Sequence, residues 1–155
     1  MVFGFIYDFL DKFKAADFHI SPTMHVRTVQ RKFKENFGLT LRIYKGKQFA
    51  DGGSTIAALD RRTRANVDTT AADIVIKASM TAGEVERLVK GNYGLTVQVA
   101  NEYNTYCLKN KYTLGQAGRK EDLEDWCKEK GHDGIEGWLK SEKCATVDEW
   151  YKKNR

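Results

Sequence analysis

The chain has 155 residues, 41% hydrophobic and 30% charged, with a formal net charge of +5, which suits one domain or one domain with a small appendage. A membrane-spanning helix is not expected, because no apolar run approaches the roughly 20 residues that such a helix needs. The apolar N-terminus lacks basic residues before its apolar run and carries Asp8 and Asp11, which argues against a signal peptide and favours a cytoplasmic protein.

The first segment, 1–16, is predicted to be an amphipathic helix. Its apolar stripe consists of Val2, Phe3, Phe5, Ile6, Phe9, Leu10 and Phe13. We expect this stripe to pack on the domain or on a second copy of the protein. A membrane-surface helix is the alternative, although the polar face offers only Lys12 and Lys14 as cations.

Two copies of one phrase follow, 56 positions apart: residues 36–41 read Asn-Phe-Gly-Leu-Thr-Leu and residues 92–97 read Asn-Tyr-Gly-Leu-Thr-Val. Eight of the twenty positions from 24 to 43 are identical at this offset, where ordinary composition would give about one. We interpret the pattern as an internal duplication with repeats at 19–62 and 75–118.

In the first repeat, residues 17–20 are predicted to form a strand, and Ser21-Pro22-Thr23 is expected to end it and cap a helix. Apolar residues at steps of three and four predict that helix: Val26, Val29, Phe33 and Phe37. Gly38 is expected to end the helix in the left-handed conformation. The alternation of apolar and polar residues over 39–44 then predicts a half-buried strand.

The first repeat is expected to finish with a tight turn at 45–47, a return strand at 48–50 and a brief helix at 55–62 that Ser54 caps. Residues 63–72 are expected to be a polar connection. The second repeat is predicted to follow the same order: a strand at 74–77, a helix at 81–92, Gly94 as its stop, a strand at 95–100, a return strand at 106–108, and Thr113-Leu114 in the place of Thr55-Ile56.

Two strand–helix–strand units in tandem predict the α+β class. Each unit is expected to make a right-handed crossover, which would give a ferredoxin-like or related mixed sheet backed by helices. The brief helix between the units is a departure from that pattern, so a six-stranded variant or a β-grasp-like arrangement is the alternative.

The wording of residues 29–51, with Thr113-Leu114, resembles a family of small uncharacterised bacterial proteins. Those proteins share the phrase "FGLTLR.Y.G..FAD" and a weaker second copy of it. The resemblance covers residues 19–118 and not the C-terminal tail, and it implies no catalytic residue.

The tail, 119–155, has a different pattern, in which Trp126, Trp138 and Trp150 recur every 12 positions. Three very short helices are predicted, with their tryptophan and aliphatic faces in contact. Because helices of this length are marginal alone, we expect them to pack together or on the main domain. Capping boxes are expected to begin at Asp133 and Thr146.

Catalytic and metal-binding patterns are weak in this sequence. His19 is expected to be structural, and neither it nor His25 has a nucleophile at a recognisable spacing. Cys127, His132 and Cys144 supply only three metal ligands without a C-x-x-C knuckle. The three cysteines, Cys107, Cys127 and Cys144, are typical of reduced thiols.

Gly52-Gly53-Ser54-Thr55 lacks the P-loop lysine, so a capped loop is favoured over an anion site. We therefore expect a non-enzymatic protein that needs no cofactor and no metal.

Residues 25–64 hold ten Lys/Arg against three Asp/Glu, so this segment carries +7 and the rest of the chain −2. The candidate basic surface consists of Arg27, Arg31, Lys34, Arg42, Lys45 and Lys47, with Tyr44 and Phe49 as stacking groups. The candidate apolar contact residues are Phe5, Phe9, Trp126, Trp138 and Trp150.

The first hypothesis is a protein-interaction module, of adaptor or inhibitor type, that binds another protein or itself. The alternative is a nucleic-acid-binding domain that uses the basic first repeat. A phage-style inhibitor of another protein is compatible with the sequence but has no positive support in it.

Overall fold

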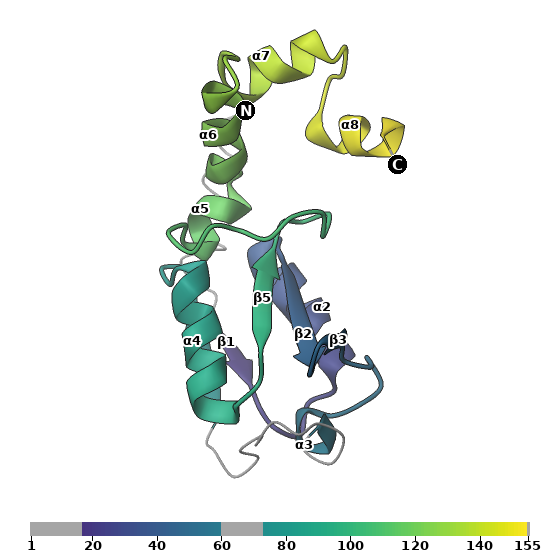
Figure 1. Ribbon diagram of the computed structural model, residues 1–155, viewed down its shortest axis with the longest axis vertical. Coiled ribbons are helices and arrows are strands. Elements are labelled where there is room, and N and C mark those ends of the chain that lie inside the picture. Colours follow the sequence, from purple (N-terminus) through teal and green to yellow (C-terminus); the bar gives the residue numbers. More distant parts are fainter. Residues whose placement is uncertain (1–16, 60–72, 155) are drawn as a thin grey trace. The chain divides into compact units, whose positions relative to one another are not determined.

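The computed structural model describes residues 17–59 and 73–154 (Figure 1). The predicted N-terminal helix at 1–16, with Phe5 and Phe9, and the whole predicted connection at 63–72 lie outside the described residues. The described chain is α+β, as predicted, and it divides into two compact units, 1–118 and 119–155. Among the described helices, none is long and apolar enough to cross a membrane.

The first unit contains two successive series of elements. The first series is β1 (Asp17–Ile20), α2 (Val26–Phe37), β2 (Thr40–Lys45), β3 (Gln48–Phe49) and α3 (Ile56–Leu59). The second series is β4 (Ile74–Lys77), α4 (Ala82–Tyr93), β5 (Val97–Ala100) and α5 (Leu114–Gly118). The order of strands and helices follows the prediction except at 106–108, where the expected return strand is reduced to an isolated bridge between Ala100 and Cys107.

The strands form two antiparallel sheets instead of the expected single mixed sheet. β1 pairs with β4, while β2 lies between β3 and β5. The strands on either side of α2 thus belong to different sheets, and the ferredoxin-like strand order is not present. The crossover rule applies only to two strands of the same sheet, whereas β1 and β2 here pair with β4 and β5 of the other series.

The two series meet symmetrically in register. His19 lies opposite Val75 in the β1–β4 pair, and Arg42 lies opposite Gln98 in the β2–β5 pair. Both pairs join positions that are 56 apart. Each sheet therefore brings a residue of the first series against the residue at the same place in the second.

The same backbone hydrogen bonds also recur in both series. They are Val26 N–H to Ser54 O and Ala82 N–H to Tyr112 O (2.8 and 2.9 Å), Ala50 N–H to Ile43 O and Leu108 N–H to Val99 O (both 2.9 Å), and Ile56 N–H to Met24 O and Leu114 N–H to Met80 O (3.0 and 2.9 Å). Beyond the loop after β5 the matching offset is 58, because that loop is two residues longer.

Both long helices end as predicted. Gly38 and Gly94 adopt the left-handed conformation, with φ of 67° and 73°, and their N–H groups donate to the carbonyls of Lys34 and Lys90. Glycine reaches this conformation without the strain that a Cβ brings. The chain then turns back, so that the strand after each helix packs against it.

The expected cap of α2 is wrong. Ser21 and Thr23 bond to each other (3.0 Å) within the preceding turn, and the N-cap residue is His25, which makes no side-chain capping bond. The first N–H groups of α2, from Val26 and Arg27, are instead satisfied by carbonyls of the segment after β3. That segment is brought there by the fold, so a local sequence pattern does not reveal it.

The cap of the brief helix α3 is also displaced from the prediction, by one residue. Thr55, and not Ser54, accepts the bond from Ala58 N–H (3.0 Å) before α3. Thr113 accepts from Gln116 N–H (3.0 Å), and the Gln116 side chain accepts from Thr113 N–H (2.9 Å). Only the second series therefore has a reciprocal capping pair.

The second unit contains the three predicted short helices, α6 (Glu121–Glu129), α7 (Gly134–Ser141) and α8 (Val147–Lys153). Their tryptophans are in contact, with ring centroids 6.0 Å apart for Trp126 and Trp138 and 5.1 Å apart for Trp138 and Trp150. The cap at Thr146 is confirmed by its bond from Glu149 N–H (3.0 Å).

The expected cap at Asp133 is wrong, because Asp133 makes no capping bond to α7. The Glu124 carboxylate, from α6, accepts from Ile135 N–H (2.8 Å) and takes its place. A side chain from one short helix thus satisfies the first turn of the next.

Candidate interaction surface

The β3–β2–β5 sheet has one buried face and one outer face. Residues on the buried face are Leu41, Ile43, Val97 and Val99, each at most 4% exposed. Because side chains alternate along a strand, Arg42, Tyr44 and Gln98 lie on the outer face, where they are half-buried. The long helices pack on the strands of this sheet, α2 on β2 and α4 on β5. The outer face carries the candidate binding groups.

An aromatic pair occupies the β3 side of this outer face. Tyr44 and Phe49 are register partners in the β2–β3 pair, and their rings stack with centroids 5.1 Å apart and planes 28° apart. Phe49 remains 64% exposed, which is the highest value among the large apolar side chains described. The Tyr44 hydroxyl bonds to Gln98 Oε1 (2.6 Å), which holds the tyrosine ring in place beneath the phenylalanine.

Arg42 is held by the loop after β5. Its Nε donates to Asn104 Oδ1 (2.6 Å), one terminal nitrogen donates to Asn104 O (3.2 Å), and the other lies 3.2 Å from Cys107 Sγ. Cys107 Sγ in turn lies 3.3 Å from Gln98 Oε1. The guanidinium therefore binds groups of the same molecule, although the sequence pattern predicted that Arg42 belongs to a ligand-binding surface.

The outer face differs strongly between the two series. At the offset of 58, Cys107 stands where the first series has Phe49, and at the offset of 56, Ala100 stands where it has Tyr44. The bridge between Ala100 and Cys107 corresponds to the Tyr44–Phe49 pair. The aromatic pair therefore exists on the β3 side alone, while the longer loop covers Arg42 on the opposite side.

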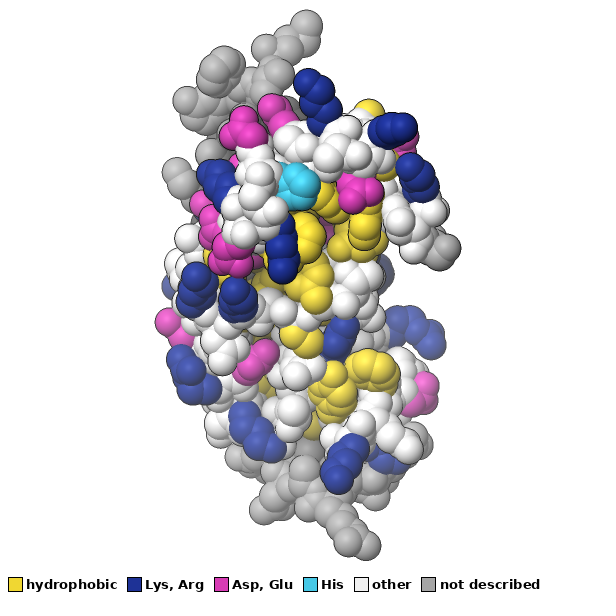
Figure 2. All heavy atoms as spheres, turned by 45° about the horizontal axis from the view of Figure 1, so that its top comes forward, with side chains coloured by type: hydrophobic (Ala, Val, Ile, Leu, Met, Phe, Trp, Pro, Cys, Tyr) yellow, Lys and Arg dark blue, Asp and Glu magenta, His cyan; other side chains and the backbone are white. Residues whose placement is uncertain are grey.

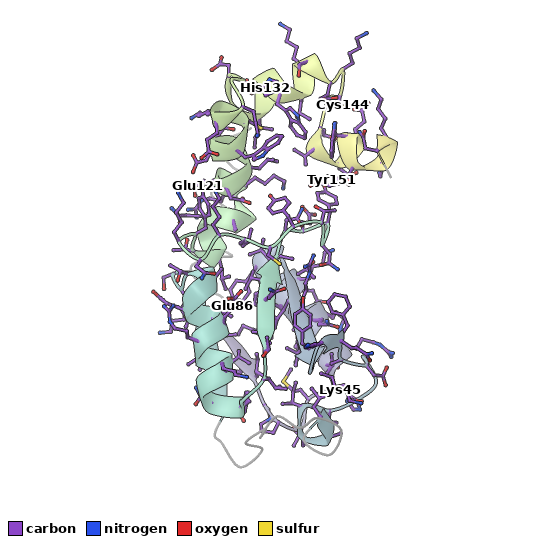
Figure 3. All side chains as sticks on the ribbon, in the orientation of Figure 1. Lys45, Glu86, Glu121, His132, Cys144 and Tyr151 are labelled. Carbon is purple, nitrogen blue, oxygen red and sulfur yellow. The ribbon has the colours of Figure 1, made fainter. Side chains whose placement is uncertain are left out.

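The remaining candidate cations lie on α2 and in the β2–β3 hairpin. Arg27, Arg31 and Lys34 are exposed on α2, and Lys34 Nζ donates to Glu102 O (2.9 Å). Lys45 and Lys47 belong to the β2–β3 hairpin (Figure 3). Figure 2 shows Lys and Arg side chains scattered singly over the visible surface, without one continuous basic patch.

Four of these cations have no partner within the described part of the chain. Arg27, Arg31, Lys45 and Lys47 make no side-chain hydrogen bond or ion pair there, and the ion pairs found between described residues lie in 119–155. The Arg27 side chain rests against Gly52, where an added Cβ would lie 3.4 Å from Nε. Arg27 and the two hairpin lysines therefore flank the segment that carries Phe49.

The tryptophans of the tail differ in exposure. Trp126 is 43% exposed, whereas Trp138 is only 5% exposed and belongs to the centre of the second unit. Trp150 is half-buried, and its Nε1 is a buried donor without a partner among the described residues. Of the three, Trp126 offers the most surface to a partner.

Three titratable groups have shifted pKa values. Burial raises the pKa of Glu86, on the side of α4 near β5 (Figure 3), against a hydrogen bond to the backbone of Val99 and the nearby charge of Arg87. Burial also raises the pKa of Tyr93, whose hydroxyl donates to Ile20 O (2.8 Å). The pKa of Cys127 is raised by burial and then by Glu124.

Glu86 and Tyr93 belong to the first unit and Cys127 to the second, and His19 and His25 are exposed. His19, expected to be structural, lies on the outer face of the β1–β4 pair. Within the described residues, no three His, Cys, Asp or Glu side chains come together as metal ligands.

The sequence indicates the pairing of Phe49 with Tyr44 but not the exposure of Phe49. A hairpin with Gly46 and Lys47 at its turn places Tyr44 opposite Phe49, so the pairing follows from loop length. What the sequence does not contain is the exposure of Phe49, because an aromatic residue in a return strand is normally expected in the core.

Comparisons with protein families, with curated proteins and with solved structures found no match to this chain.

Proposed function

We propose that this protein is a non-enzymatic, cytoplasmic protein-interaction module that binds through the outer face of the β3–β2–β5 sheet. The observation that carries the proposal is the stacked pair of Tyr44 and Phe49, with Phe49 64% exposed. Burying a phenylalanine side chain fully is worth about 1.5–3 kcal/mol. An aromatic side chain held on a rigid strand is a typical anchor of a protein interface.

The test compares two exposed aromatic residues of the first unit. Phe49→Ser removes the proposed anchor, and Tyr106→Ser, at a residue 37% exposed, is the matched control. We expect nuclease-treated extract of the producing cell to yield a set of proteins that the wild type and Tyr106→Ser retain and Phe49→Ser loses. Equal retention by all three proteins would contradict the proposal.

Self-association is the form of this function in which the partner is a second copy. Light scattering of the same three proteins decides it. A dimer that Phe49→Ser converts to a monomer would identify the outer face as a homodimer contact, and a monomeric wild type would leave the partner as another protein.

The alternative function is nucleic-acid binding by the exposed cations of α2. It is supported by Arg27 and Arg31, because neither side chain has a partner in the described part of the chain. The second helix provides a matched control, since Arg87 and Lys90 occupy the places of Arg31 and Lys34. If nucleic acid is the ligand, affinity for a mixed-sequence single strand should fall steeply with salt. Arg31→Ala/Lys34→Ala should weaken it far more than Arg87→Ala/Lys90→Ala.

No binding at low salt would eliminate the nucleic-acid function. Equal weakening by the two double variants would show that the charge acts without a defined site.

We also propose that 19–62 and 75–118 are two copies of one ancestral unit. The sequence offset of 56, the recurring backbone bonds and the pairing of His19 with Val75 and of Arg42 with Gln98 support this. The aromatic pair then marks a place where the copies diverged, which is where a function added after duplication is expected.

A further inference from the structure

We infer that the partner bound at the β3 side is an acidic protein segment that places an apolar side chain on Phe49. This inference rests on the proposed interaction function and adds the chemistry of the partner to it. Three observations support it: the cations near the aromatic pair, the internal hydrogen bonds of Arg42, and the absence of this arrangement from the second series.

The hairpin and loop around Phe49 carry more cations than carboxylates. Lys45 and Lys47 lie in its hairpin, Arg27 rests against Gly52 three residues later, and none of the three has a partner among the described residues. Asp51 is the single acidic residue between 36 and 59. A partner with carboxylates next to its apolar contact would be attracted to this rim and oriented on it.

The arrangement fits a protein segment better than a nucleic acid. An apolar centre with charged groups at its edge is the usual anatomy of a protein interface. Arg42 is the cation on the sheet face itself. Its guanidinium donates to Asn104 and lies against Cys107, so it is not free to contact a phosphate. Within the stacked pair only Phe49 is exposed, whereas single-stranded binding usually uses successive aromatic platforms.

The second series does not repeat this arrangement. Its counterparts of Phe49 and Arg27 are Cys107 and Gly83, and the counterpart of Lys45 is Asn101, which is buried at 7% exposure. The internal symmetry therefore gives one binding place per chain and not two. We expect one acidic segment bound to each chain.

The test uses the isotope-labelled full chain and amide chemical shifts, which detect weak binding and locate it. The probes are three short synthetic peptides with one central leucine, flanked by glutamates, by serines or by lysines, and an oligothymidine. We expect the glutamate peptide to bind most tightly and to shift the amides of β2 and β3. The lysine peptide should bind most weakly.

Two double variants carry the same loss of charge. Lys45→Ala/Lys47→Ala should weaken the glutamate peptide by about two- to five-fold for each cation removed and leave the serine peptide unchanged. Lys109→Ala/Lys111→Ala, at exposed positions of the second series, should leave both peptides unchanged. Phe49→Ser should weaken both peptides, because it removes the apolar anchor.

The outcomes separate the two proposals. Equal binding of the glutamate and serine peptides, both lost in Phe49→Ser, would overturn the acidic partner while supporting the interaction surface. Binding of oligothymidine alone would overturn both and favour the nucleic-acid function. Shifts outside β2 and β3, or no shifts with any probe, would count against both proposals.

Discussion

Glu86 and Gln30 hold corresponding places on α4 and α2, yet they meet the sheet in different ways. The Gln30 amide donates to Leu41 O (3.1 Å). The Glu86 carboxyl lies against β5, where burial raises its pKa above the reference value of 4.5. The first series thus has a neutral amide where the second has a group that burial discourages from ionising.

This difference predicts a pH-dependent effect of Glu86→Gln. Because the folded-state pKa is raised, the fold favours the protonated carboxyl, and this contribution is lost as pH rises through the raised value. We expect Glu86→Gln to be more stable than the wild type near neutral pH, with the difference vanishing below the unfolded-state pKa of 4.5. Urea unfolding followed by circular dichroism checks this.

The control for this prediction is Glu35→Gln, which changes an exposed carboxyl on α2. Because this side chain is exposed, the substitution removes a carboxylate without removing a buried one. A Glu86→Gln protein that is less stable than the wild type at neutral pH would contradict the expected cause of the shift.

At the scale of elements, the contact between α6 and α7 depends on one carboxylate and one glycine. Glu124 caps Ile135 N–H, and Gly134, at the start of α7, has φ of 71°. A Cβ at Gly134 would overlap the Glu124 carboxyl. The glycine is needed both for its backbone conformation and for the space in which the cap lies.

Gly134→Ala should therefore destabilise the second unit more than Gly131→Ala. Gly131 also has a positive φ of 88°, but an added Cβ there meets nothing within 4 Å, so its cost is the left-handed strain of about 1–2 kcal/mol. Gly134→Ala should add the loss of the Glu124 cap, about 0.5–2 kcal/mol. Tryptophan fluorescence measures both, because all three tryptophans lie in 119–155. Equal costs for the two variants would show that the cap contributes nothing.

The elements show which parts of the fold are local. The glycines after the periodic apolar residues predicted where α2 and α4 end, and the bounds expected for α4 were right to within one residue, whereas the expected cap of α2 was wrong. Helix termination could be predicted because it depends on neighbouring residues. The pairing of β2 with β5 and the capping of α2 by carbonyls after β3 were not predictable, because they depend on segments that folding brings together.

In the candidate surface, too, some features follow from neighbouring residues and others depend on distant segments. The exposure of Arg27, Arg31 and Lys34 followed from helical spacing, since these residues lie opposite the apolar face. The engagement of Arg42 by Asn104 did not, because the loop that holds it follows 62 positions later in the chain. Whether a charged side chain is available depends on such contacts.

At the scale of the whole molecule, the two compact units differ in the size of the apolar core that stabilises each of them. The second unit spans residues 119–155, a length at which domains usually need a disulfide, a metal or a partner. Its cysteines, Cys127 and Cys144, are both free. The first unit has a much larger apolar core, made by two long helices and two sheets.

We therefore expect two transitions in urea. Tryptophan fluorescence reports the second unit alone, and circular dichroism is dominated by the first. The fluorescence midpoint should come first, by about 1 M or more, which corresponds to a few kcal/mol at usual denaturant sensitivities. Coincident midpoints would mean that the two units unfold as one cooperative system.

The register of the β2–β5 pair has a consequence for how the chain arose. In the duplication that we propose, the ancestor was a single unit whose two identical subunits paired as the two series now do, so each residue at the position of Arg42 faced its own copy. Two arginines directly opposite each other repel, so this position could not carry an arginine in the symmetric ancestor without a cost. In this proposal, fusion into one gene would have removed that constraint and allowed an arginine at position 42 to face Gln98, as it does now. One side of the sheet could then close over its arginine while the other carries the Tyr44–Phe49 pair with Phe49 exposed.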